Sequence, residues 1–342
     1  MRILPIFLAL GGTVFAQDKV ALVPADPHEL VTGMAQVLST PDDRVNAMAL
    51  LERAKQNSDM HMPGAAPFDL KMALNVIGGG ARTGMGEVAE TWFRGTSWRY
   101  EQTLGTYSEV RISGSRGQTF MKRTEIAPIP VQMVRAALFW PVGGNPSTSM
   151  IRSAPAQWNG KPVTVILISG NTDSIYPGRH WVETEYVVDN ATGLLQIYSR
   201  APGTFAVYSY DKGLQFHGRL MADRITFFVA GLQVVDAQLM SIADPGNIDA
   251  KLLSPTPEMR LIAMGGGNQR FPLVIHDPTN SGMLKQVIVH ALIDANGNVV
   301  DSVFSAAADP ALIDTALDLV RKTKFAVGTQ QVDAYINVRF VP

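Results

Sequence analysis

The sequence predicts an α+β protein with a helical N-terminal segment, a large curved antiparallel β-sheet with covering helices, and a small ββαβ unit at the C-terminus. Three observations predict this fold class. Helix-start signals precede residue 65, apolar residues alternate with a period of two through residues 66–243, and turn, cap and strand signals follow in residues 282–342. Residues 244–281 are rich in proline and glycine, so we expect a linker between the two sheet regions.

Composition narrows the classes of function. The 342 residues are enough for two sizeable cores. The formal net charge is −1, so no excess of basic residues points to nucleic acid. Cysteine is absent, which excludes disulfides, thiolate catalysis, thiolate metal sites and lipid attachment of the bacterial lipoprotein type.

Residues 1–16 are expected to be a cleavable signal peptide. Arg2 gives a positive start, and the apolar run Ile3–Ala16 is too short to span a bilayer comfortably. Val14–Ala16 suits a signal peptidase, so we expect cleavage before Gln17. The alternative is an uncleaved anchor, which N-terminal sequencing of the exported protein would reveal. After cleavage no segment is long and apolar enough to cross a membrane, and we expect the protein in the periplasm.

Residues 17–65 are expected to form a helical segment. His28–Leu38 has the pattern of one short amphipathic helix. Thr40 then caps a second helix, and Pro41 takes its first position. Asp42 and Asp43 follow at the positive end of the helix dipole. These helices are expected to cap the start of the sheet region.

Residues 66–243 are expected to form an antiparallel meander. In Pro67–Ile77, large apolar residues alternate with polar or smaller ones, and further short strands follow, separated by turns that contain glycine and serine. Ile129–Val142 interrupts this alternation with the spacing of a short apolar helix that ends before Pro141. A helix inserted in this way is expected to cover the concave face of the sheet.

The C-terminal residues 282–342 carry the signals of a compact unit. Gln286–Ile293 and Asn298–Phe304 are expected to be strands joined by a tight turn at Asp294–Gly297. Asp309-Pro310 has the cap and first residue of a helix. Val332–Val341 alternates cleanly and is expected to be the last strand.

The sheet region resembles the LolA-like family of periplasmic carriers. The resemblance lies in Phe68–Leu70, Glu90–Trp92, Trp98–Glu101 and Val188–Leu194. It implies a half-barrel whose helices close over a hydrophobic cavity that holds a lipid or the acyl chain of a lipoprotein. The residues that would line this cavity are Phe68, Met72, Trp92, Trp98, Leu138 and Trp140. The alternative is that they form an ordinary packed core.

The C-terminal unit resembles the C-terminal domain of TonB and its periplasmic relatives over residues 287–340. The resemblance implies docking on an envelope protein, such as an outer-membrane receptor, through a sheet edge that takes up an extended peptide. The implied edge is Val332–Val341. Its partner-binding face would be Asp333, Tyr335, Asn337 and Arg339. The alternative is a strand packed against another domain of the same chain.

The sequence departs from an energy-transducing TonB protein in two ways. It lacks a persistent N-terminal anchor and a long proline-rich spacer with alternating charges. Energy transduction for outer-membrane transport therefore remains an alternative, and docking is the expected role of the C-terminal unit.

No catalytic, metal-binding or cofactor-binding residues are predicted. The six histidines lack metal-ligand spacing, and no Gly-x-Ser-x-Gly elbow is present. The glycine-rich stretch Gly78–Gly86 lacks the Lys-Ser/Thr pair of a phosphate loop. We therefore expect a non-enzymatic envelope protein that docks on a partner and holds an apolar ligand. The alternatives are a scaffold that binds no small molecule and a hydrolase of an unrecognised type.

Overall fold

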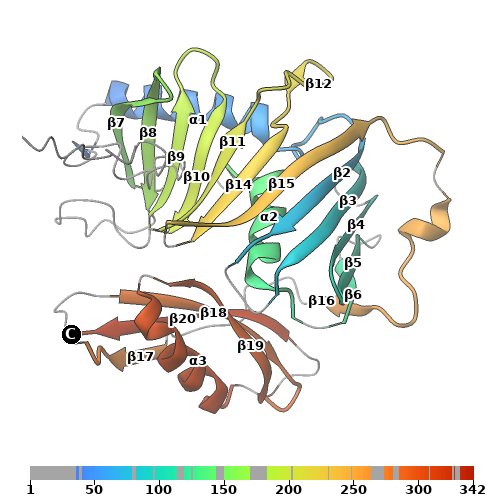
Figure 1. Ribbon diagram of the computed structural model, residues 1–342, viewed down its shortest axis with the longest axis vertical. Coiled ribbons are helices and arrows are strands. Elements are labelled where there is room, and N and C mark those ends of the chain that lie inside the picture. Colours follow the sequence, from blue (N-terminus) through green and yellow to red (C-terminus); the bar gives the residue numbers. More distant parts are fainter. Residues whose placement is uncertain are drawn as a thin grey trace, which may run out of the picture.

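The structure of the protein is a computed structural model (Figure 1). It describes residues 36–37, 41–78, 82–94, 97–113, 119–124, 126–143, 150–169, 183–201, 203–229, 231–247, 249–262, 273–279, 285–307, 309–325, 327 and 332–342. The predicted signal peptide and its cleavage site lie outside these residues. Within them, no helix has both the length and the apolar character needed to cross a bilayer.

A large antiparallel sheet dominates the described part of the chain. It contains fourteen strands in the order β1-β7-β8-β9-β10-β11-β14-β15-β2-β3-β4-β5-β6-β16. Their bounds are β1 (Gln36–Val37), β2 (Phe68–Val76), β3 (Gly84–Arg94), β4 (Ser97–Leu104), β5 (Tyr107–Ser113), β6 (Thr119–Arg123), β7 (Met150–Trp158), β8 (Lys161–Ser169), β9 (Thr184–Asp189), β10 (Leu195–Ala201), β11 (Thr204–Ser209), β14 (Arg224–Val229), β15 (Leu232–Ala243) and β16 (Arg260–Ile262). A separate hairpin, β12 (Gln215–Phe216) with β13 (Arg219–Leu220), lies between β11 and β14 in the chain.

Two meanders make up this sheet. Strands β2–β6 pair with their chain neighbours, as do β7–β11 and β14–β15. The two meanders join because β15 pairs with β2 over a long register that includes Ala237 opposite Leu74. The predicted alternation is confirmed in β2, where Phe68, Leu70 and every second residue after them are buried. The sheet curves around α2, as Figure 1 shows.

Two helices pack on the sheet. Helix α1 (Pro41–Ser58) begins at the predicted proline and contacts β7, β9 and β10. Helix α2 (Ile129–Phe139) ends close to the predicted boundary. Buried residues of both helices belong to one core on the same side of the sheet. The helix predicted over His28–Leu38 is wrong at Gln36–Val37, because these residues form β1 and pair with β7.

The C-terminal unit contains the predicted order of two strands, a helix and a strand. These elements are β18 (Lys285–Ile293), β19 (Val299–Ala307), α3 (Ile313–Lys322) and β20 (Val332–Val341). A 3₁₀ turn, η5 (Pro310–Leu312), leads into α3. The turn between the first two strands includes Gly297 at a φ of 82°, a conformation that glycine adopts without strain. The unit has its own apolar core.

The segment predicted as a linker contributes to both sheets. It contains a 3₁₀ turn, η4 (Ala250–Leu253), and strand β16, which pairs with β6 at one edge of the large sheet. It also contains β17 (Leu273–His276), which pairs with β20 in parallel. The small sheet therefore has the order β17-β20-β18-β19. Strand β20 was predicted to be an edge strand, and this is wrong for its C-terminal half, because Val338–Val341 lies between β18 and β17.

Candidate functional site

An apolar cleft lies where α2, the large sheet and the C-terminal unit meet, and we call it the joint cleft. It is lined by Gln132, Met133, Ala136, Ala137, Tyr198, Arg200, Thr204, Phe205, Ala206, Phe227 and Tyr335. These residues come from α2, β10, β11, β14 and β20. About 500 Å³ of empty space lies between these walls, open solvent included, but the centres of water molecules can occupy only about 50 Å³ of it. It is therefore a slot and not a wide chamber.

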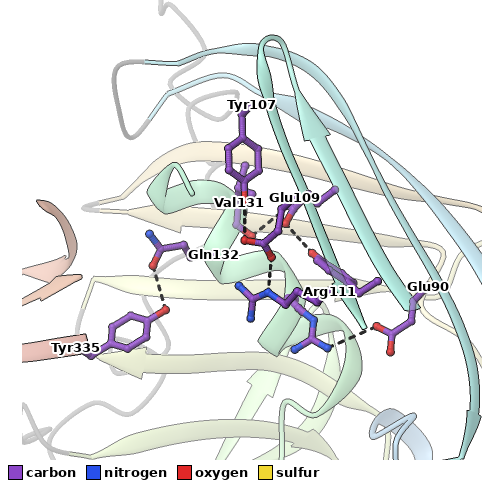
Figure 2. Close-up of polar contacts among 10 residues, drawn as sticks. Glu90, Tyr107, Glu109, Arg111, Val131, Gln132 and Tyr335 are labelled. Carbon is purple, nitrogen blue, oxygen red and sulfur yellow. Dashed lines mark hydrogen bonds and ion pairs between the residues drawn. The ribbon is translucent and has the colours of Figure 1, made fainter. Parts of the chain in front are cut away.

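Tyr335 closes the joint cleft from the C-terminal unit. Its hydroxyl donates a hydrogen bond to Gln132 Oε1 at 3.1 Å, as Figure 2 shows. The ring stacks on His290 of β18, with 4.6 Å between ring centroids. The guanidinium carbon of Arg200 lies 5.6 Å from the centre of the Tyr335 ring. One side chain thus connects the small sheet to both α2 and β10.

The predicted partner-binding face of β20 does not form one free surface. Tyr335 turns toward the large sheet, which matches the alternative of a strand packed against another domain of the chain. Arg339 is half-buried, and its backbone lies opposite Gln286 on one side and Val274 on the other. Asn337 is also half-buried, and Asp333 lies opposite Leu292. The edge prediction failed because β17, which is short and rich in apolar residues, was assigned to the linker.

The six predicted cavity residues converge on a packed core beside α2. Phe68, Met72, Trp92 and Leu138 are buried. Phe68 and Trp92 stack on His61 at centroid distances of 5.9 and 5.5 Å, and Trp140 lies 5.3 Å from it. None of the six lines the joint cleft. Side chains of α2 fill much of the space beside these residues, and Phe68 also lines a separate pocket toward Phe216 and Arg219. A single cavity lined by all six residues therefore stays a prediction.

Cationic and aromatic side chains fill that space together. The Arg135 guanidinium of α2 lies over the rings of Trp98, Tyr100 and Trp140 at 5.1, 4.6 and 4.6 Å. Phe139 of α2 stacks on His61 at 4.9 Å. Arginine attracts the negative faces of aromatic rings, and this attraction is stronger where water is excluded. This side of α2 is held in place by both packing and charge.

A buried polar network continues under α2 (Figure 2). Glu90 is fully buried; its two carboxylate oxygens lie 2.8 Å from His61 Nε2 and 4.0 Å from Arg135 Nη2. Glu109 accepts hydrogen bonds from Arg111 and, at 2.9 Å, from the Tyr107 hydroxyl.

Burial and charge act against each other in this network. Burial alone would raise the pKa of Glu109, but Arg111 and Tyr107 hold that pKa below its usual range. Burial lowers the pKa of Arg135, and Glu90 opposes this effect.

The sequence carries a signal for this network that our prediction did not use. Four polar residues of these strands face inward: Glu90, Tyr100, Glu109 and Arg111. Each lies directly opposite another inward-facing residue on a neighbouring strand, as Glu109 lies opposite Gln102. A charged residue on the apolar face of an alternating strand marks a buried pair or a site. Within the described residues, no three histidine, aspartate or glutamate side chains gather as metal ligands.

Comparisons with known proteins give similarities at low identity. The structure resembles a LolA superfamily protein from Nitrosomonas europaea (TM-score 0.41, 10% identity, covering 61% of this chain and 97% of that one). It resembles a domain described as a candidate outer membrane lipoprotein-sorting protein from Vibrio parahaemolyticus (TM-score 0.39, 9% identity, 60% and 96% coverage). It also resembles a chain of the Pseudomonas aeruginosa MucA/MucB complex (TM-score 0.25, 11% identity, 75% and 82% coverage).

No protein-family model matches the chain, and no curated protein matches it. A TonB C-terminal domain is not shown by any of these comparisons. At such identities and TM-scores, the similar structures carry no function over to this chain, and its own side chains must be used to infer one.

Proposed function

We propose that this protein is a non-enzymatic binding protein of the cell envelope that holds the acyl chain of a lipid or lipoprotein in the joint cleft. The observation that carries this proposal is the apolar lining of the cleft by Met133, Ala136, Ala137, Phe205 and Phe227. Each buried methylene of a chain contributes about 0.8 kcal/mol. The narrowness of the slot suits an unbranched chain better than a bulky ring system.

Polar groups beside the slot can hold the end of such a chain. Five residues of its walls have side chains that can form hydrogen bonds: Gln132, Tyr198, Arg200, Thr204 and Tyr335. Arg200 is exposed, and no carboxylate of the described residues forms an ion pair with it. A carboxylate or phosphate at the end of the chain can therefore form charge-assisted hydrogen bonds with Arg200. The predicted signal peptide supports a periplasmic location.

A fluorescent acyl chain tests this function. The exported protein is titrated with cis-parinaric acid, and Ala136→Trp fills the slot from α2. Ala250→Trp, on the exposed turn η4, is the matched control. We expect saturable binding by the wild type and by the control, and at least tenfold weaker binding by Ala136→Trp. Equal binding by all three proteins, or no saturable binding by the wild type, contradicts the proposal.

Docking of a partner strand is a second candidate function, and strand β19 favours it. β19 pairs with β18 on one side, and no described strand pairs with its other side. Val300 on this strand is exposed. An extended segment of an envelope protein can add to such an edge by main-chain hydrogen bonds. The sequence predicted docking at β20, and we propose β19 as the docking edge instead. A relationship of the C-terminal unit to TonB is part of this proposal.

Site-specific photocrosslinking tests the second candidate in cells that export the protein. A benzoylphenylalanine replaces Val300 on β19, and the same residue replaces Val45, which is exposed on α1, as the control. We expect one specific adduct at position 300 and none at position 45. The same adducts at both positions, or none at position 300, rule out docking at β19.

A further inference from the structure

A second pocket, the hairpin pocket, lies between the loop that follows α1 and the β12–β13 hairpin. Its side-chain walls include Met60, Phe68, Phe216, His217, Arg219 and Met221, and its volume is about 230 Å³. None of these residues lines the joint cleft. The pocket therefore combines an apolar floor with two side chains that can carry positive charge, at a place separate from the proposed acyl-chain site.

The hairpin turn brings an aromatic ring and a guanidinium to one side of the pocket. His217 and Gly218 form a two-residue turn with φ values of 47° and 78°, as a type I′ turn requires. This turn sets Phe216 directly opposite Arg219. Residues that are directly opposite on paired strands project to the same face. The local sequence of the turn thus places the Phe216 ring and the Arg219 guanidinium side by side in the pocket wall.

Arg219 has a buried donor that has no partner among the described residues. Its Nη2 donates a hydrogen bond to the Asp59 carbonyl oxygen at 2.7 Å. Its Nε is buried and has no hydrogen-bond partner among the described residues. The Asp59 carboxyl group instead accepts a hydrogen bond from the Val142 N–H at 3.0 Å. A buried donor without an acceptor is costly, and it points to a bound group that supplies one.

His217 adds a second polar contact at the same pocket. Its Nε2 lies 2.6 Å from Asp244 Oδ1. This contact orients the ring and leaves Nδ1 for a further partner, as a carboxylate partner does for many functional histidines. The other large side chains of the walls are two methionines and two phenylalanines, beside Gly64, Ala65 and Ala66. Thioether sulfurs and aromatic edges both pack favourably against an aromatic ring.

We infer that the hairpin pocket binds a small aromatic carboxylate. The ring lies among Met60, Phe68, Phe216 and Met221, and the carboxylate accepts hydrogen bonds from Arg219 Nε and from the Nδ1–H of His217 in its imidazolium form. The volume supports this size, because a cavity of about 150 Å³ takes benzene and 230 Å³ leaves room for a short acidic side chain. The inference stands apart from the acyl-chain proposal, since it uses no residue of the joint cleft.

Titration with 3-phenylpropionate, followed by NMR of ¹³C-methyl methionine, tests the inference. We expect saturating shifts of the Met60 and Met221 methyl signals, with a Kd on the order of 0.1 mM. 3-Phenylpropanol, which has the same ring but no charge, should bind at least tenfold more weakly. Arg219→Gln should weaken binding of the acid to the level of the alcohol. Arg224→Gln, an arginine outside the pocket, should bind both probes as the wild type does.

Three results overturn the inference. The first is the absence of any shift at Met60 and Met221 at millimolar probe. The second is equal affinity for the acid and the alcohol, and the third is unchanged affinity of Arg219→Gln. Because Arg219 also holds the Asp59 carbonyl, Ala66→Phe provides a second variant that fills the pocket from its wall. It should abolish the shifts, whereas Ala136→Trp in the joint cleft should leave them unchanged.

Discussion

Helix α2 is tightly packed on the side that faces β2–β5 and open on the side that faces β10–β14. On the packed side, Arg135 and Phe139 meet the aromatic rings of the first meander. On the open side, the joint cleft remains unfilled beside the α2 residues Met133, Ala136 and Ala137. The difference teaches that a curved sheet does not by itself provide a cavity. The side chains of the covering helix decide where space remains.

We expect the largest difference between the two sides of α2 when a packed side chain is truncated on each side. Phe139→Ala should lower the free energy of unfolding by about 4 kcal/mol, because it removes a fully buried ring that contacts His61 and Phe68. Met133→Ala on the open side should cost about 1 kcal/mol, since Met133 is only half-buried. Urea unfolding measures both. Similar losses for the two variants contradict the difference between the two sides.

Removing charge on the packed side should have the next largest effect. Arg135→Met leaves the buried Glu90 carboxylate without its cationic neighbour, so we expect a loss of about 3 kcal/mol in the free energy of unfolding. Combining it with Glu90→Gln should recover part of this loss. Arg200→Met on the open side should cost less than about 1 kcal/mol. Glu90→Gln alone completes the cycle, and a double variant whose loss equals the sum of the two single losses means that the two groups do not interact.

The pH dependence of stability should reveal the raised pKa of Asp59, whose carboxyl group is hydrogen-bonded to the segment after α2. Burial raises the pKa of Asp59 from 3.8 to about 6, although the Val142 N–H and Lys55 oppose this. The folded state therefore holds this proton more tightly than the unfolded state. Its stabilising effect is fully present below pH 3.8 and is lost as pH rises through 6.

Asp59→Asn is the variant that isolates this effect. Between pH 4 and 7 the wild type should lose about 2.5 kcal/mol of unfolding free energy through Asp59, and the variant should lack this loss. Asp211→Asn, an exposed aspartate, is the control and should follow the wild type. Chemical unfolding at several pH values measures the difference. Parallel curves for the wild type and Asp59→Asn contradict the raised pKa.

Two tyrosine hydroxyls provide the finest comparison, between a buried and an exposed contact on the open side of α2. Tyr208 is buried and donates to the Ala137 carbonyl oxygen at 2.7 Å, whereas Tyr335 is 39% exposed and donates to Gln132. Tyr208→Phe should cost about 1.5 kcal/mol, and Tyr335→Phe about 0.5 kcal/mol. Thermal unfolding of the two variants measures the order. A larger loss for Tyr335→Phe would mean that the contact between the two units is stronger than its exposure indicates.

Much of the element order follows from local sequence signals. Pro41 begins α1, the alternation from Phe68 appears in β2, and the turn before Asn298 separates β18 from β19. Each signal acts within a few residues, through a fixed φ, a two-residue period or a positive φ. The short strands β1 and β17 lack such signals. They are strands because β7 and β20 offer them unpaired backbone groups.

The candidate site was predictable only in part. The alternation correctly places Phe68, Met72 and Trp92 on the inner face of the sheet. It does not tell whether that face encloses a void, because the answer depends on how Arg135 and Phe139 of α2 fill it. No sequence signal brings Arg200 and Tyr335 together, since they lie on different sheets.

The sequence alone determined where α1, β2 and the strands around the Gly297 turn begin, which of their faces are apolar, and that no cysteine chemistry is available. These properties depend on single residues and on short-range spacing. The tertiary structure decided that β20 lies inside its sheet, that side chains fill much of the space under α2, and that Tyr335 closes a cleft. These properties depend on contacts between distant segments, whose fit is set by side-chain volumes and by pairing across the two sheets.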